Sequence, residues 1–193
     1  WNAINTPKVE QWVTRIVASK WDINTVYCSQ NGYREDDFSP MLWKSVDQGK
    51  TWQSIVGNLP NEPINTIRED PIRQDLLWTG TDMGVYCSFD AGKTWIPYGG
   101  GIPHTPVHDL VIQPKAKELV IASHARSVWV VSTQPALDLT EIAERDRCRR
   151  RDLPQRAALG GALVAQRLPQ LTPKQSHDHS LSIVSLVWER YSP

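Results

Sequence analysis

The 193-residue sequence is poor in cysteine, has no excess of either charge and contains no long apolar run. Its three cysteines lack the spacing of metal ligands and do not support a disulfide framework, so the redox compartment stays open. Equal numbers of basic and acidic residues, 21 of each, provide no net attraction toward nucleic acid or an anionic membrane. No apolar stretch approaches the ~20 residues of a membrane-spanning helix. We therefore expect no nucleic-acid partner, membrane span, cofactor or bound metal.

The sequence is rich in tryptophan, with nine, and it repeats one signature. Segments 45–52 and 88–95 both read S-x-D-x-G-K-T-W and lie 43 positions apart. A fixed period of this length indicates a repeat architecture, and four-stranded propeller blades have this size. The shared positions are Ser45, Asp47, Gly49, Thr51 and Trp52 in the first copy and Ser88, Asp90, Gly92, Thr94 and Trp95 in the second.

The residues that flank the signature repeat as well. The 43-residue shift pairs Pro63 with Pro106 and brings three apolar runs into register. A shift of 51 reveals an upstream copy, in which Ile16 pairs with Ile67, and the eight extra residues fall around positions 31–40. The chain therefore contains three consecutive repeats.

Each repeat consists of short apolar strands separated by turn residues. β-Branched and aromatic runs bounded by Gly, Asn, Asp and Pro are typical of strands, and this region shows no helical period. Each signature is expected to be a turn that leads into a fourth strand. The predicted fold is all-β, with about three four-stranded antiparallel β-propeller blades of a larger ring. The predicted strands are 13–18, 25–28 and 42–45, then 64–68, 76–79 and 85–88, then 107–112, 118–122 and 128–132.

The signature has a structural interpretation. Asp47 and Asp90 are short acceptors that can bind the backbone amides of their turns. Gly49 and Gly92 allow positive φ where a hairpin requires it. The two signature tryptophans are large enough to pack between neighbouring sheets. We expect neither aspartate to be catalytic.

The two ends differ from the central repeats. Residues 1–4 align with residues 52–55, so Trp1 matches the last residue of a preceding signature. This alignment predicts a fragment whose remaining blades complete the ring. Beyond about residue 138 arginines alternate with acids, which favours a solvated face over a nucleic-acid site. We expect three blades over 1–137 and an irregular or partly helical tail, linker or poorly ordered segment over 138–193.

Polar and aromatic residues gather in loops that are expected opposite the signature turns. In a four-stranded blade, the loop between the second and third strands and the link to the next blade share that face. Pairing of the arginines with neighbouring carboxylates to hold loops together is the alternative role. His108 and Asp109 lie on the inner strand of the third repeat. They either point into the central channel of the propeller or make structural hydrogen bonds. The candidate catalytic residues are Asp36, Asp37 and Asp82, with Glu62 a further acid, and the candidate ligand-binding residues are Tyr33, Arg34, Phe38, His124 and Arg126.

The signature resembles the Asp-box (BNR) repeat of sialidases, other propeller glycosidases and sortilin-type receptors. Residues 12–132 resemble the last blades of large bacterial propellers of the glycosyl hydrolase-like and sortilin-like classes, through segments 31–38, 69–71, 80–86 and 124–129. The resemblance implies a propeller that acts on or binds carbohydrate. Its alternative is a non-catalytic, sortilin-like propeller that binds peptide or glycan. An extracellular or periplasmic location is also implied.

Whether the protein is an enzyme stays open at this point. A glycosidase needs two carboxylates roughly 5–10 Å apart across the scissile bond, and one of them can lie in blades outside this sequence. Arg34, Arg126 and Tyr33 supply only part of the arginine cluster and Tyr–Glu pair of a sialidase. A binding module needs only stacking aromatics and hydrogen-bonding loops, and a purely structural domain needs neither. We expect this chain alone to be inactive as a glycoside hydrolase.

Overall fold

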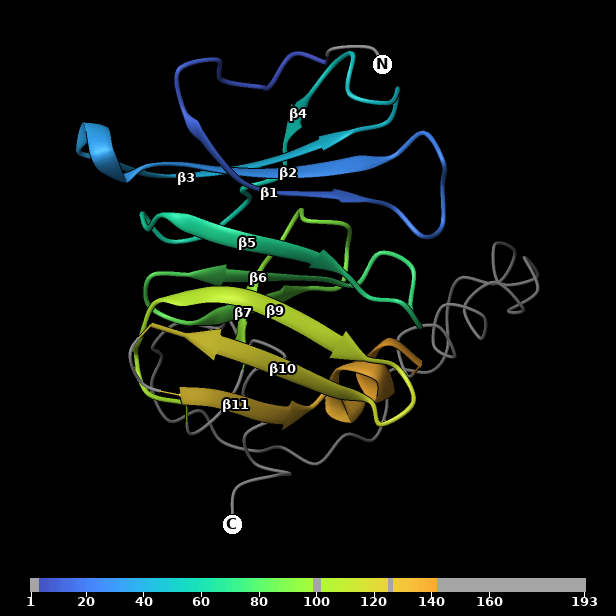
Figure 1. Ribbon diagram of the computed structural model, residues 1–193. Coiled ribbons are helices and arrows are strands. Elements are labelled where there is room, and N and C mark those ends of the chain that lie inside the picture. Colours follow the sequence, from blue (N-terminus) through green and yellow to red (C-terminus); the bar gives the residue numbers. More distant parts are fainter. Residues whose placement is uncertain (1–3, 99–101, 125–126, 142–193) are drawn as a thin grey trace, which may run out of the picture. The chain divides into compact units, whose positions relative to one another are not determined.

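The computed structural model describes residues 4–98, 102–124 and 127–141 of the chain (Figure 1). A first compact unit ends at Leu137. The first unit is built from antiparallel β-sheets. In the described ranges, no helix is long and apolar enough to cross a membrane.

Three antiparallel sheets follow one another along the chain, and within each sheet every strand pairs with the next in sequence (Figure 1). The first sheet contains β1 (Trp12–Ala18), β2 (Val26–Gly32), β3 (Asp37–Ser45) and β4 (Gln53–Ser54). The second contains β5 (Ile64–Glu69), β6 (Leu77–Thr81), β7 (Val85–Ser88) and β8 (Ile96–Tyr98). The third contains β9 (Val107–Gln113), β10 (Glu118–Ser123) and β11 (Ser127–Ser132). These meanders are propeller blades, which confirms the predicted fold class.

The third sheet has three strands in the described part of the chain, as the three strands predicted for the third repeat indicate, because no signature turn follows β11 to start a fourth. One detail differs from the prediction. The eight-residue insertion was expected to be a loop, but it is not one. Instead β2 continues to Gly32, which pairs with Asp37 of β3, and a 3-10 turn, η1 (Tyr33–Glu35), closes the hairpin. Extending the hairpin satisfies backbone groups that a loop would leave to water.

The second blade is buried on both of its faces. Successive side chains of a strand point to opposite sides of a sheet, so Leu77 packs toward the first blade while Leu76 and Trp78 pack toward the third. All five residues of β6 are consequently buried. Partners on the first side include Leu42, Ile64, Ile67 and Trp95, and partners on the other include Leu110, Leu119 and Ile121.

The two signature turns contain the same hydrogen bonds. Ser45 Oγ donates to Asp47 Oδ1 at 2.7 Å and accepts the Gly49 amide at 2.8 Å. The Asp47 carboxylate accepts the Thr51 amide at 2.8 Å and the Thr51 hydroxyl at 2.6 Å. The equivalent bonds in the second copy measure 2.8, 2.8, 2.8 and 2.7 Å. Hydrogen bonds from Thr51 and Ser45 lower the pKa of Asp47 to about 2, and both signature glycines have the expected positive φ.

Each signature tryptophan ties its turn to the preceding segment of the fold. Trp95 is 2% exposed, and its indole donates to the Ile55 carbonyl at 2.9 Å. The Asn58 side chain accepts from the Trp95 amide at 2.6 Å and donates to its carbonyl at 3.0 Å. Half-buried Trp52 makes the equivalent bond, to the Asn5 carbonyl, at 2.9 Å. The signature turn is therefore also the contact between blades.

Replacing the buried tryptophan should destabilise the fold more than replacing its repeat-related counterpart. Trp95→Ala is expected to lower the free energy of unfolding by about 3–5 kcal/mol, because it leaves a cavity between two sheets. Trp52→Ala is the matched control and should cost less, since Trp52 is only half-buried. Urea unfolding followed by circular dichroism measures both. Equal losses in the two variants would contradict the proposed contact.

Candidate functional site

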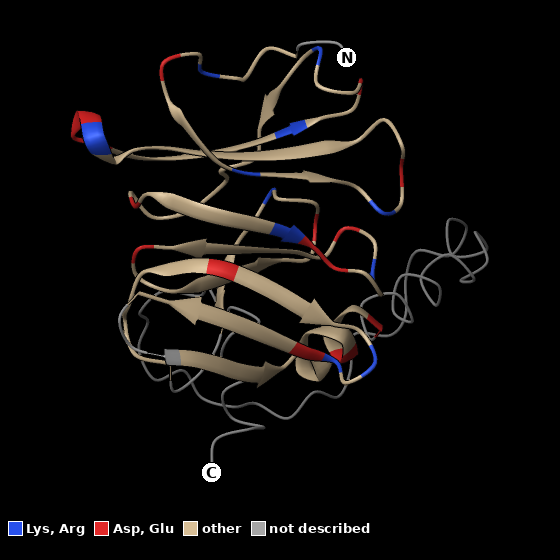
Figure 2. Cartoon of the chain, in the orientation of Figure 1, with Lys and Arg blue, Asp and Glu red and all other residues tan. Residues whose placement is uncertain are grey.

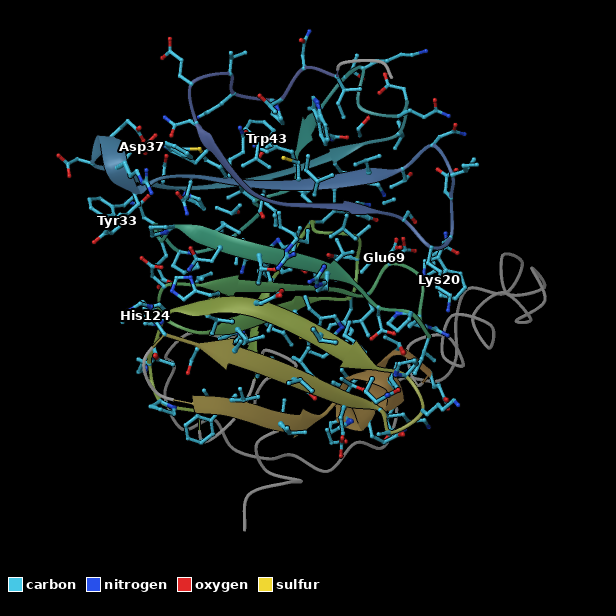
Figure 3. All side chains as sticks on the ribbon, in the orientation of Figure 1. Lys20, Tyr33, Asp37, Trp43, Glu69 and His124 are labelled. Atoms are coloured by element: carbon cyan, nitrogen blue, oxygen red, sulfur yellow. The ribbon has the colours of Figure 1, made fainter. Side chains whose placement is uncertain are left out.

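The loops between second and third strands lie opposite the signature turns. Ser45, where the first signature turn begins, pairs with Val26 at the end of the β2–β3 hairpin away from η1. Figure 3 shows Tyr33 and His124 at the left edge of the sheets and Lys20 at the right edge. We call the face that carries η1, the β6–β7 turn and His124 the hairpin face. It carries candidate residues of all three blades, among those that the structure describes.

Three aromatic rings are exposed on the hairpin face of the first blade. Trp12, Tyr33 and Phe38, here called the aromatic cluster, are 52, 60 and 44% exposed. Tyr33 and Phe38 meet edge to face, with ring centroids 5.8 Å apart. The Arg34 guanidinium lies 4.4 Å from the Trp12 ring centroid, and Glu35 accepts from the Trp12 indole at 3.3 Å. These contacts restrict the orientation of rings that are exposed to solvent. Exposed, ordered aromatic rings are typical of a binding surface.

The carboxylates beside the aromatic cluster have different surroundings. Asp36 is exposed and has a left-handed φ of 56°, a conformation that aspartate tolerates better than most residues. Asp37 accepts hydrogen bonds from the hydroxyl and the amide of Ser39. These two bonds lower the pKa of Asp37. Asp37 is therefore ionised at neutral pH and acts there as an acceptor.

Asp82 belongs to a hydrogen-bonded chain that runs from the first blade to the second. The Asn31 side chain donates to Asn65 Oδ1 at 3.4 Å, and Asn65 Nδ2 donates to Asp82 Oδ1 at 2.8 Å. The Thr81 hydroxyl donates to Glu62 Oε2 at 2.7 Å. The two candidate acids Asp82 and Glu62 therefore both accept hydrogen bonds from side chains of the protein.

One residue in the first strand of each blade lies in a β-bulge, and the three positions are equivalent in the repeats. They are Thr14, Asn65 and His108, related by the shifts of 51 and 43 residues. A bulge bends its strand and re-aims a side chain. Each bulge residue contacts a residue in or just after its own second strand. Thr14 contacts Ser29 in the middle of β2, Asn65 contacts Asp82 after β6, and His108 contacts His124 after β10. The sequence analysis did not identify these positions. A polar residue at the same place in three otherwise apolar strands is the sequence feature that could have revealed them.

An ion-pair cluster joins the first strands of all three blades, whereas most charged residues lie in turns (Figure 2). Asp109 Oδ1 on β9 lies 2.6 Å from Arg15 Nη2 on β1 and 2.8 Å from Arg68 Nη2 on β5. The same oxygen accepts the Leu110 amide at 2.8 Å. Asp109 therefore has the hydrogen-bonded structural role that was one of its two predicted roles.

Acid should weaken this cluster. Burial alone would raise the pKa of Asp109, but the Leu110 amide and the Arg68 and Arg15 guanidiniums outweigh it and the net shift is downward. A carboxyl group whose pKa is lowered by folding stabilises the fold at every pH above its pKa in the unfolded state, ~3.9. This stabilisation is lost as the pH falls through the pKa of the folded state.

Asp109→Asn is expected to lower the free energy of unfolding at pH 7 by about 1–2 kcal/mol, a range that allows for partial exposure of the cluster. The deficit relative to the wild type should shrink below about pH 4, because the wild-type carboxylate is then protonated too. Denaturant unfolding between pH 3 and 7 (an interval set by the ~3.9 reference) tests this, with the exposed Glu10→Gln as control. A deficit that stays constant with pH would contradict the role of the charge.

The motif at residues 69–71 is structural and lies on the opposite edge of the sheets. Glu69 accepts from the Ser19 hydroxyl at 2.9 Å, the Lys20 amide at 2.7 Å and the Tyr27 hydroxyl at 3.1 Å. Figure 3 shows Glu69 and Lys20 close together there. These bonds connect the turn after β1 to the end of β5, and so the first blade to the second.

The described cysteines are ordinary strand residues. Cys28 and Cys87 are free and buried in different blades. Burial raises the pKa of the Cys28 thiol to about 11 and raises that of Cys87 further. Neither thiol is a nucleophile at neutral pH. Cys148 lies outside the described residues.

The structure brings most of the predicted site residues to one face, but it does not show that they act on one ligand. Five of them, Tyr33, Arg34, Asp36, Asp37 and Phe38, lie at the tip of the β2–β3 hairpin. Asp82 and His124 lie at the same face in the second and third blades, and Arg126 lies outside the described residues. Arg34 stacks on a ring, a role that the sequence did not predict.

The fold is similar to that of solved propeller proteins. A GH74 enzyme from Niastella koreensis has a TM-score of 0.50 and 16% identity, over 62% of this chain and 21% of that one. The GH74 xyloglucanase from Xanthomonas campestris has a TM-score of 0.48 and 14% identity, over 62% and 21% of the two chains. YCF48 bound to D1 peptide has a TM-score of 0.47 and 16% identity, over 68% and 39%. No protein-family model and no curated protein matches the sequence. This chain thus spans about a fifth of the Niastella enzyme, and the likeness shows a propeller fold.

Proposed function

We propose that the hairpin face binds carbohydrate as part of a glycosyl hydrolase-like propeller, with the aromatic cluster as the main contact. The observation that supports this proposal is a group of three exposed rings, at and beside the tip of the β2–β3 hairpin, that are ordered by contacts with their neighbours. The C–H face of a sugar ring buries apolar area against such rings. Arg34, Glu35 and Asp36 around them offer donors and acceptors for sugar hydroxyls.

Binding fits the described residues better than acid catalysis does. A glycosidase requires one carboxyl group that stays protonated until it protonates the leaving oxygen. The Ser39 bonds to Asp37 favour its ionised form. Asp37 is therefore suited to accepting a hydrogen bond from a sugar hydroxyl and not to protonating a leaving oxygen.

Loss of the aromatic rings should weaken binding. Trp12→Ala, Tyr33→Ala and Phe38→Ala are each expected to lower affinity for a bound polysaccharide about tenfold, the effect of ~1.4 kcal/mol of stacking. Affinity electrophoresis against soluble polysaccharides measures the change in the parent protein. Trp21→Ala is the matched control, because Trp21 is 42% exposed in the turn after β1, away from the hairpin face.

Equal loss in the Trp21 variant, or no binding of any polysaccharide by the parent protein, would contradict the proposal. Binding of peptides in place of polysaccharides would favour the sortilin-like alternative. Replacing Asp36, Asp37 and Asp82 by asparagine separates the two kinds of function when polysaccharide hydrolysis is measured beside affinity. An enzyme would lose turnover and keep affinity, whereas a binding module would lose affinity or be unaffected.

A further inference from the structure

Two exposed histidines face each other on the hairpin face of the third blade. His108 lies on β9 and His124 directly follows β10, and their ring centroids are 5.1 Å apart with the planes tilted by 59°. Figure 3 shows His124 at the left edge of the sheets. We propose that this pair binds a divalent transition-metal ion of the class that prefers imidazole, namely Zn²⁺, Ni²⁺ or Cu²⁺. The inference does not depend on carbohydrate binding.

The separation of the rings suits a shared ion. Imidazole nitrogens bind such ions at ~2.0–2.1 Å, so two rings that meet one ion at a roughly tetrahedral angle have centroids about 5 Å apart. The observed 5.1 Å agrees with this geometry. The 59° tilt also suits two ring edges turned toward one point, whereas parallel stacked rings direct their nitrogens side by side.

The backbone holds both histidines in place without help from the rings. A β-bulge leaves His108 unpaired, while Val107 and Asp109 on either side of it pair with β10. The bulge re-aims the His108 side chain relative to a regular strand. The His124 amide donates to the Pro106 carbonyl at 2.9 Å, which anchors His124 beside the start of β9. Two ligands on fixed backbone positions lose little freedom when they bind an ion.

The site has two protein ligands. A third histidine on this face, His104, has its Nδ1 3.2 Å from the Met83 carbonyl and is engaged there. No group of three or more His, Cys, Asp or Glu side chains able to hold a metal occurs within the described ranges. The remaining coordination positions are therefore open to water or to an oxygen of a bound molecule. Affinity should follow the usual order for nitrogen ligands, with Cu²⁺ bound most tightly.

Calorimetric titration of the full chain with Ni²⁺ or Zn²⁺ tests the pair directly. His108→Ala and His124→Ala are each expected to abolish binding of about one ion or to lower the affinity for that ion at least about tenfold. The matched control His104→Ala is expected to bind the ion as the wild type does. His177, His179 and Cys148 lie outside the described residues and are present in all four proteins, so their contribution cancels in the comparison. Wild-type binding in the two variants, or equal loss in His104→Ala, would overturn the proposal.

A second measurement needs no substitution and so does not depend on how a variant folds. Addition of substoichiometric Cu²⁺ to the wild-type chain should broaden the histidine ring proton resonances of His108 and His124 together, before that of His104. Broadening of His104 first, or of only one member of the pair, would overturn the two-histidine site.

Discussion

The structure depends on burial of each blade between its neighbours. A single meander of short strands exposes two apolar faces, and only a neighbouring sheet can remove both from water. In the second blade, Leu77 packs toward the first sheet while Leu76 and Trp78 pack toward the third. The signature turn serves the same contact, because Trp95 is inserted between sheets and hydrogen-bonded to the segment that ends the preceding blade. The repeat is therefore a unit of packing as well as a pattern in the sequence.

This packing positions the hairpin face. Once the sheets are stacked, the ends of their second strands lie side by side, and polar side chains connect them across the blades, as in the Asn31–Asn65–Asp82 chain. The bulges add a second regularity. They place one polar residue of each first strand against the second strand or the residue that follows it, and the identity of that polar residue differs from blade to blade. A propeller can in this way keep one scaffold and vary its chemistry at equivalent positions.

The sequence predicted the elements well where their signals are local. The alternation of apolar and turn residues located every strand of the three sheets, and the signature located the turns that precede β4 and β8. The insertion was misjudged as a loop, since its polar residues hid a register in which Gly32 pairs with Asp37. The candidate residues were predicted as a set on one face, but their contacts were not. Arg34 was predicted to bind ligand, with pairing to a carboxylate as the alternative, and it lies over the Trp12 ring, 22 positions earlier in the sequence.

The sequence by itself determined the repeat length, the strand order and the signature turns, because these follow from interactions between residues a few positions apart. The hydrogen bonds from Thr51 to Asp47 span four residues and recur between Thr94 and Asp90 in the second copy. Only the tertiary structure decided that Asp109 meets arginines of two other blades and that His108 meets His124. Such contacts depend on strand register, on a bulge of one residue and on the angle between sheets. A slip of one residue in any strand reverses which side chains face each other, and short-range patterns do not specify this.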